Sequence, residues 1–177
     1  TAALELKQPL WVAVVKGHTE IAQLLIKNGA DINLKDGLDK SILEVAFEKK
    51  QEAVVKALIE KGVNIKSKDF MRSFIHSAAE NGWEDIIELL IEKGADVHEK
   101  GWHNNTALYY AVINGHFDAV EFILSKGGDV NATWWKWSLL DQAKRNKHDN
   151  VATLLRRHGA KSHEVLKAEG KWRHDSS

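Results

Sequence analysis

Apolar residues recur along the chain in pairs that are separated by one turn of a helix. The stretches Ile21–Leu25, Ile86–Leu90 and Val151–Leu155 each place two apolar pairs around one polar residue. A spacing of three to four residues matches the period of an α-helix and not the alternation of a strand. A glycine typical of a helix end follows these three stretches and two further apolar stretches, at Gly29, Gly62, Gly94, Gly127 and Gly159. The pattern therefore predicts a series of amphipathic helices.

The predicted helices recur with a nearly fixed period. The five glycines are separated by 33, 32, 33 and 32 residues. Alanines at one position of each unit repeat in the same steps, at Ala13, Ala46, Ala78, Ala111 and Ala143. Two independent marks with one shared period indicate a repeat protein, in which each unit buries its apolar face only against its neighbours.

Each unit carries the signals of two helices joined by a turn. A hydroxyl residue suited to cap the first helix opens four of the five units, at Ser41, Ser73, Thr106 and Ser138. Glycine stands at the turn in three units, at Gly17, Gly82 and Gly115. Lys50 and Lys147 occupy this position in the other two, where a left-handed backbone would cost each lysine about 1 kcal/mol.

Several short motifs carry a family resemblance. Gln8–Trp11 and Thr106–Tyr109 are similar to the Thr-Pro-Leu-His tetrapeptide of ankyrin repeats. Gly17–His18 and Gly115–His116 are similar to the Gly-His turn of that family, and Gly29–Asn33 is similar to its Gly-Ala-Asp-Val-Asn stretch. The chain therefore resembles an ankyrin-repeat protein.

The resemblance covers roughly residues 5–161. It implies an all-α solenoid of stacked helix-turn-helix units with hairpin-like finger loops. We expect one ankyrin-repeat domain at residues 1–161, with repeats at approximately 1–34, 35–66, 67–98, 99–131 and 132–161. Residues 162–177 are expected to form a C-terminal capping segment, in which Ser162 starts a short helix, or a disordered tail.

The chain departs from the family pattern at several helix starts. It contains one proline, so four repeats lack the proline of the tetrapeptide. Only Ser73–His76 keeps the histidine of the tetrapeptide, and we expect His76 to be a hydrogen-bonded helix-start residue. Trp11 replaces that histidine in the first repeat, and Trp83 replaces the histidine of the turn in the third. Both tryptophans are expected to be structural.

The resemblance implies a binding surface formed by the finger loops and the first helices, because ankyrin proteins generally bind other proteins on their concave face. Large apolar residues at exposed finger tips need an explanation, and Trp, Tyr, Met and Arg are enriched at binding hot spots. We therefore predict a protein-binding strip that consists of Leu38, Phe70, Met71, Arg72, Trp102, His103, Trp134, Trp135 and Trp137 in the fingers, with Glu80, Asn81, Tyr110, Ile113, Asn114, Lys144 and Arg145 in and around the first helices. The alternative is that the tryptophans fold back on the shortened fingers and seal the end of the stack.

Charge and composition narrow the class of partner. Basic and acidic residues number 25 each, and a net charge of zero does not favour nucleic acid as the main partner. The segment Lys161–Arg173 mixes basic and aromatic residues, which leaves single-strand binding as a weak alternative. The absence of cysteine excludes disulfides and thiolate chemistry, and no apolar run approaches the length of a membrane span. We expect a cytoplasmic or otherwise intracellular protein with a protein partner.

The sequence shows no motif for catalysis, cofactor binding or metal binding. Glycines occur singly rather than in phosphate-binding clusters, and neither a Gly-x-Ser-x-Gly nor a His-Glu-x-x-His pattern is present. His18, His116 and His148 share one repeat position, so the spacing of packed helices places them too far apart to share an ion. We predict a non-catalytic protein-protein interaction module with no cofactor. Two alternatives stay open: the regulatory or targeting part of a larger enzyme, and a self-associating, homodimeric ankyrin of natural or engineered origin.

Overall fold

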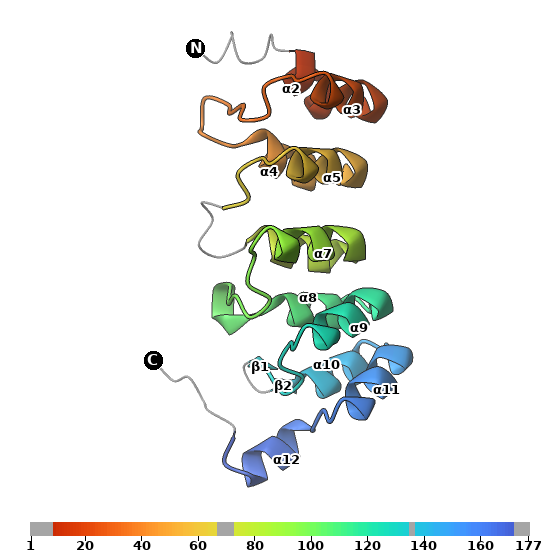
Figure 1. The fold of residues 1–177 in the computed structure, drawn as a ribbon. Coiled ribbons are helices and arrows are strands. Elements are labelled where there is room, and N and C mark those ends of the chain that lie inside the picture. The colour runs from red at the N-terminus through yellow and green to blue at the C-terminus, as the bar shows by residue number, and fades with distance from the viewer. Residues whose placement is uncertain (1–8, 67–72, 135–136, 172–177) are drawn as a thin grey trace. The chain divides into compact units, whose positions relative to one another are not determined.

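The computed structural model describes residues 9–66, 73–134 and 137–171, with Trp102 and Trp134 described through their backbone alone. The chain divides into two compact units, residues 1–65 and 66–177, which we describe separately. The helices of the first unit are α2 (Pro9–Lys16), α3 (Thr19–Lys27), α4 (Ile42–Glu48) and α5 (Glu52–Glu60). Helix α2 packs on α3 and α4, and α5 packs on the same two helices, so two helix pairs are stacked (Figure 1).

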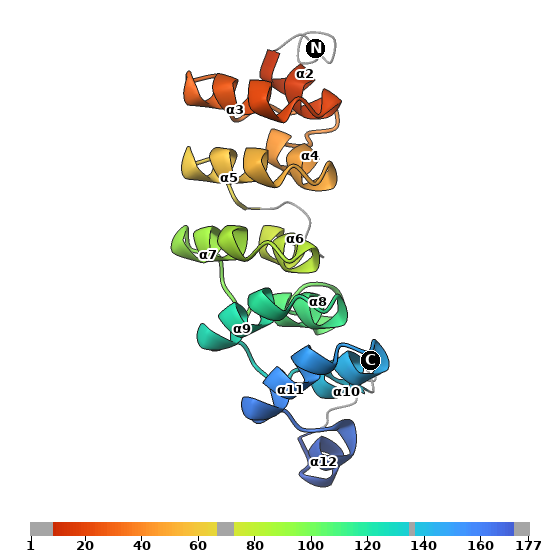
Figure 2. The ribbon, with the colours of Figure 1, turned by 90° about the vertical axis from the view of Figure 1, so that its right-hand side faces the viewer.

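The described part of the second unit contains three helix pairs. They are α6 (Phe74–Asn81) with α7 (Glu84–Glu92), α8 (Ala107–Ile113) with α9 (Phe117–Ser125), and α10 (Leu139–Arg145) with α11 (Asp149–Arg157). The first helices α6, α8 and α10 pack on one another in order. The second helices α7, α9 and α11 also pack in order and form a second row beside them (Figure 2). The predicted class, an all-α fold of repeated helix pairs, is confirmed.

Among the described residues, strand pairing occurs in two finger loops. The fifth finger is an antiparallel hairpin of β1 (Thr133–Trp134) and β2 (Trp137–Ser138), in which Trp134 lies opposite Trp137. The second finger is closed by a single bridge between Lys35 and Ser41. These two loops therefore have the hairpin-like form that the resemblance implied.

The core is formed by the residues that repeat in the sequence. The five alanines of the repeat period are all buried, and their small side chains allow the helices to pack closely. Trp11 is buried as well, which confirms that it is structural. Trp83 precedes α7 as its N-cap residue and is half-buried.

Reciprocal hydrogen bonds fix the starts of the first helices. The hydroxyl of Ser41 accepts from the backbone N–H of Glu44 at 3.2 Å, and the Glu44 carboxylate accepts in return from the backbone N–H of Ser41. Ser138 and Asp141 form the same arrangement at α10. Such capping boxes satisfy N–H groups that a helix leaves without an internal partner. Ser41 and Ser138 are thus confirmed as capping residues, and Thr106 accepts from the backbone N–H of Tyr109 at a longer 3.5 Å. At Ser73 it is the backbone N–H that is capped, by Nδ1 of His76 at 3.1 Å.

The turn between the helices has the left-handed backbone that the glycines predicted. Lys50 and Lys147 adopt φ values of 53° and 60°, so both lysines carry the expected strain of about 1 kcal/mol. At Gly82 a further constraint applies, because a Cβ atom there would lie 2.5 Å from Nδ1 of His116. Glycine is therefore required at this turn by both its conformation and its neighbour.

Side chains at the start of the second helices connect successive repeats within each unit. The Nε2 atom of His116 lies 2.9 Å from the carbonyl oxygen of Glu80, and that of His148 lies 3.0 Å from the carbonyl of Ile113. Gln51 takes the same place in the first unit, where its Nε2 donates to the carbonyl of Val14 at 2.7 Å. Each bond supplies a side-chain nitrogen to a carbonyl near the C-terminal end of the preceding first helix, where a helix leaves carbonyls available for further donors.

Acidification is expected to weaken the second unit through His116. Burial, followed by the charge of His148, lowers the pKa of His116. The unfolded state therefore binds the proton more readily, and this contribution to stability is present above the ordinary imidazole pKa of about 6.5. It is lost as the pH falls through the lowered folded-state pKa. Urea denaturation of the wild type and of His116→Gln at pH 7.5 and 5.0 should show a smaller acid-induced loss in the variant, and equal losses would contradict this role.

Candidate protein-binding surface

The fifth finger brings two of the predicted binding residues together. The guanidinium carbon of Arg145, at the end of α10, lies 4.2 Å from the ring centroid of Trp137 on β2. Trp137 is half-buried and Arg145 is exposed. A cation over an indole face gains electrostatic stabilisation from the ring, so the pair holds the arginine in one place while its donors still face water.

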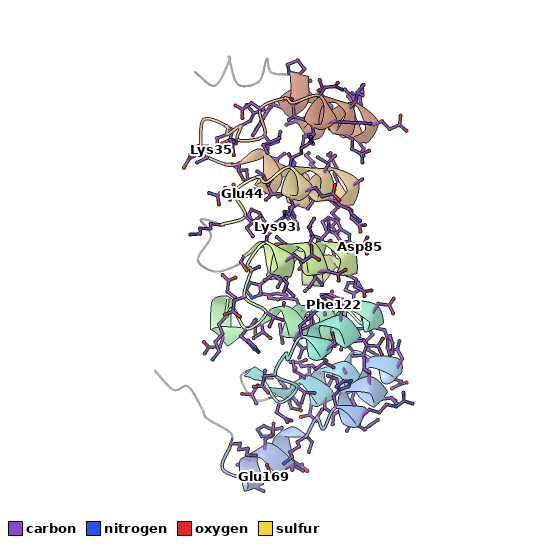
Figure 3. The ribbon with its side chains drawn as sticks, in the orientation of Figure 1. Lys35, Glu44, Asp85, Lys93, Phe122 and Glu169 are labelled. Carbon is purple, nitrogen blue, oxygen red and sulfur yellow. The ribbon has the colours of Figure 1, made fainter. Side chains whose placement is uncertain are left out.

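The second finger, in the first unit, presents one large apolar side chain. Leu38 is 90% exposed at the tip of the loop. The carboxylate of Asp36 accepts from the backbone N–H groups of Leu38 and Lys40, at 2.9 and 3.0 Å. An ion pair of 2.9 Å joins Lys35 to Asp39 across the same loop (Figure 3). These bonds order the turn, and an ordered loop costs less entropy when a partner covers its tip.

The fourth finger is a tight turn with an unusual backbone. His103 and Asn104, in the 3₁₀ turn Trp102–Asn104, adopt φ values of 55° and 60°. The backbone N–H of Gly101 donates to the carbonyl of Asn105 at 2.8 Å and closes the loop. The side chain of His103 is exposed as a result. Non-glycine residues in the left-handed region are uncommon, and such strain often marks ligand-binding loops.

The first helices of the second unit supply the flanking residues at their C-terminal ends. Glu80, Asn81 and Ile113 are half-buried, while Asn114 and Lys144 are exposed. The Asn81 and Asn114 side chains each donate to the carbonyl four residues earlier, so both amides are bonded to the backbone of their own helix. The exposed lysine and arginine of α10 also stabilise the negative end of that helix.

Tyr110 is held by aromatic neighbours on the first helices. Its ring meets that of Tyr109 edge-on with centroids 5.4 Å apart, and the ring of His76 lies 5.6 Å away. The side chain is half-buried, so a partner would reach only part of it. Burial, with a smaller effect of Tyr110, raises the pKa of the neighbouring Tyr109 hydroxyl.

Several predicted residues lie outside this description. Phe70, Met71, Arg72 and Trp135 fall outside the described residues, and the side chains of Trp102 and Trp134 are likewise not described. Leu38 belongs to the first unit and the other described candidates belong to the second. The binding strip as a whole therefore remains a prediction.

One residue that the sequence did not single out lies beside the candidates. The Nδ2 atom of Asn146 donates to the carbonyl of Ile113 at 2.8 Å, the same oxygen that His148 approaches. This bond ties the end of α10 to the end of α8. An asparagine just after a predicted helix is the only sequence signal for this contact, and it also fits a simple helix end.

The second helices of the second unit carry a cluster of acidic side chains, in contrast to the basic end of α10. Burial raises the pKa of the Glu84 carboxyl, and repulsion from Asp118, Asp85, Glu88 and Glu121 raises it further. Asp85 marks this surface on α7 (Figure 3). Because like charges already crowd there, an anionic partner is disfavoured on the second helices and favoured at the basic end of α10.

The described residues hold no group of three or more His, Cys, Asp or Glu side chains suited to bind a metal ion. Among these same residues, no helix is long and apolar enough to cross a membrane.

Comparison with known families agrees with the fold. A family model described as ankyrin repeats, in three copies, matches residues 3–69, 43–134 and 75–165. Together these matches cover most of the chain. The chain belongs to the ankyrin-repeat family, whose members act generally as protein-interaction modules.

Curated relatives share part of the chain. It is 37% identical to the E3 ubiquitin-protein ligase XBAT33 of Arabidopsis thaliana over 79 residues, and these residues are 44% of this chain. It is 32% identical over 106 residues, 60% of this chain, to the putative ankyrin repeat protein FPV244 of fowlpox virus. It is also 33% identical over 79 residues, again 44% of this chain, to the probable E3 ubiquitin-protein ligase XBOS33 of Oryza sativa subsp. japonica. The matched region spans 15% of the length of each relative.

Proposed function

We propose that this chain binds a protein partner through its finger loops and the C-terminal ends of its first helices, and that it performs no catalysis itself. The observation that carries this proposal is the pairing of Trp137 with Arg145 at 4.2 Å on the fifth repeat. Tryptophan and arginine dominate binding hot spots, because they bury large areas and form several directed contacts. Leu38 and His103 add exposed side chains on two other fingers.

Removing the aromatic–cation pair is expected to weaken partner binding at least tenfold. The double variant Trp137→Ala and Arg145→Ala loses a half-buried indole and an exposed guanidinium, and hot-spot truncations cost about 2 kcal/mol or more. Dissociation constants would be measured by interferometry for a partner isolated on the immobilised wild-type chain.

The chain offers a matched control on another surface. Lys126 lies 5.1 Å from the ring centroid of Phe122 on α9, so Phe122→Ala with Lys126→Ala removes a similar pair from a second helix (Figure 3). We expect the control variant to bind like the wild type. Equal affinities for the two double variants, or a loss of binding only in the control, would overturn the proposal. Thermal melting of both variants separates lost binding from lost folding.

A second candidate function places the chain inside a larger enzyme, as its targeting or substrate-recognition part. Two of the relatives above are named as E3 ubiquitin-protein ligases, and the matched region covers only a small share of their length. A ubiquitin-transfer assay on the product of the complete coding sequence tests this candidate. Loss of substrate ubiquitination on deletion of residues 1–177, with self-ubiquitination retained, would support it, and unchanged substrate ubiquitination would contradict it.

A further inference from the structure

The first helix pair of the chain exposes apolar side chains on one face. Val12 on α2 is 39% exposed, and Ile21 and Leu24 on α3 are 53% and 60% exposed. We call these three residues the leading face. Scattered apolar residues are normal on a protein surface, so their position in the repeat decides whether this face has a meaning.

Comparison at the same repeat position shows that Ile21 occupies a core site. It lies eight residues before Gly29, and the residues eight before the matching glycines of the second, fourth and fifth repeats are Val54, Ala119 and Val151. Each of these three is at most 1% exposed. Each also belongs to a repeat that follows another helix pair within its own unit. This is therefore the position through which a repeat packs on the pair before it.

Val12 fits the same interpretation. The equivalent residues of the second and fifth repeats, Val45 and Gln142, are each 7% exposed, and Tyr110 of the fourth repeat is half-buried. In the first unit α4 packs on α2 and α5 packs on α3, so Val45 and Val54 lie on the helices that face the preceding pair. Leu24 lies five residues before Gly29, where Ala57 and Phe122 are half-buried and Leu154 is 4% exposed. The leading face therefore occupies positions that later repeats bury wholly or in part.

The other end of the chain shows what a closed end looks like. Helix α12 (His163–Ala168) follows the fifth repeat, and its Leu166 is 1% exposed. The backbone N–H of His163 donates to the carboxylate of Asp141 on α10 at 2.7 Å. Glu164 and Lys167 are exposed, so the helix adds a largely polar outer surface. Terminal repeats need such a surface to remain soluble, and the leading face does not provide one.

We propose that the leading face docks a further ankyrin-type helix pair, supplied by polypeptide on the N-terminal side of α2. The docked helix pair would present to the leading face the same kind of surface that α2 and α3 present to Val45 and Val54. A covalently linked pair avoids the entropy loss of association, which is about 4–15 kcal/mol for separate molecules. The proposal concerns stacking rather than partner binding, so it is independent of the function proposed above.

A second copy of the chain fits this face less well. Stable interfaces bury about 800 Å² on each partner, far more than three partly exposed aliphatic side chains provide. Head-to-tail stacking is also disfavoured, because α12 already lies at the end of the fifth repeat (Figures 1 and 2).

The first test compares two substitutions at one repeat position in the 177-residue chain. Ile21→Glu is expected to change the melting temperature by about 2 °C or less, since a charge on an exposed surface costs little. Val54→Glu buries the same charge and is expected to lower it by about 10 °C or more. If Ile21→Glu is as damaging as Val54→Glu, residues of the chain itself cover the face, and the proposal is wrong.

The second test adds a helix pair before α2. A consensus ankyrin repeat fused before the full chain is expected to raise the melting temperature of the first unit by about 5 °C. The gain should disappear in the fused Ile21→Glu variant and persist in the fused Val165→Glu variant, whose residue is exposed on α12. No gain with the wild-type chain, or the same gain with Ile21→Glu, would overturn the proposal. So would a dimer mass by light scattering that Ile21→Glu reduces to a monomer, because a second copy would then occupy the face.

Discussion

Replacing Gly82 by alanine is expected to lower the free energy of unfolding of the second unit by about 3 kcal/mol. The residue has a φ of 73°, a conformation that costs an alanine about 1 kcal/mol. The new Cβ would also lie 2.5 Å from Nδ1 of His116, so the imidazole must move. Its displacement breaks the contact of Nε2 with the Glu80 carbonyl and leaves that oxygen without this partner, which adds about 1–3 kcal/mol.

Two further variants separate the cost of the left-handed backbone from the cost of moving the His116 imidazole. Gly127 has a φ of 89° and no atom near its added Cβ, so Gly127→Ala should cost only about 1 kcal/mol. In a His116→Ala background, the further loss on Gly82→Ala should fall to that same value, because the imidazole is gone. Urea denaturation is measured for the wild type, the three single variants Gly82→Ala, Gly127→Ala and His116→Ala, and the double variant. Equal losses for Gly82→Ala and Gly127→Ala would show that the close approach has no energetic consequence.

Replacing His76 by alanine is expected to destabilise the second unit by about 2–4 kcal/mol. The side chain is fully buried on α6. Its Nδ1 lies 3.1 Å from the backbone nitrogen of Ser73, and its Nε2 lies 3.0 Å from the carbonyl oxygen of Glu99. The backbone N–H of Ser73 can only donate a hydrogen bond, so Nδ1 of His76 must accept it. The ring hydrogen is then on Nε2, which donates to the backbone carbonyl of Glu99. Alanine would leave both backbone groups without this partner and a cavity between them.

The control for this substitution is a histidine with the opposite environment. His158 is exposed at the end of α11, and His158→Ala should change the free energy of unfolding by about 0.5 kcal/mol or less. Guanidinium denaturation followed by circular dichroism measures both variants. A loss at His76 no larger than that at His158 would contradict the bridging role between the helix start and the fourth finger.

The repeat pattern predicted the helices because their signals are local. Ser41 and Ser138 cap helices through residues three positions away, and the left-handed backbone at Lys50 follows from its place in a repeat of glycine turns. Trp11 was assigned to the core from its register alone, and it is buried. Such features depend on neighbours in sequence or on a period, so one chain suffices to predict them.

Contacts between repeats could not be predicted in the same way. His116 was grouped with the other turn histidines, but its bond to Glu80 and its packing on Gly82 depend on a residue more than 30 positions away. The contact of Trp137 with Arg145 depends on side-chain rotamers as well as on the hairpin register. The exposure of Ile21 required knowing which face of α3 lies against α5. Each of these features depends on how helices and side chains pack in three dimensions, which the order of apolar and polar residues does not specify.

The central claim is that a protein partner binds the fingers rather than the second helices. Its most direct test is photo-crosslinking with benzoylphenylalanine placed at Leu38, His103 and Trp137, and at the control positions Glu88 and Glu121 on α7 and α9. All of these positions except Trp137 are exposed, so most of the probes should disturb the fold little. Mass spectrometry of the adducts identifies the linked protein. We predict crosslinks to one partner from the finger positions and none from the controls. Crosslinks to a partner from Glu88 and Glu121 alone would contradict the account.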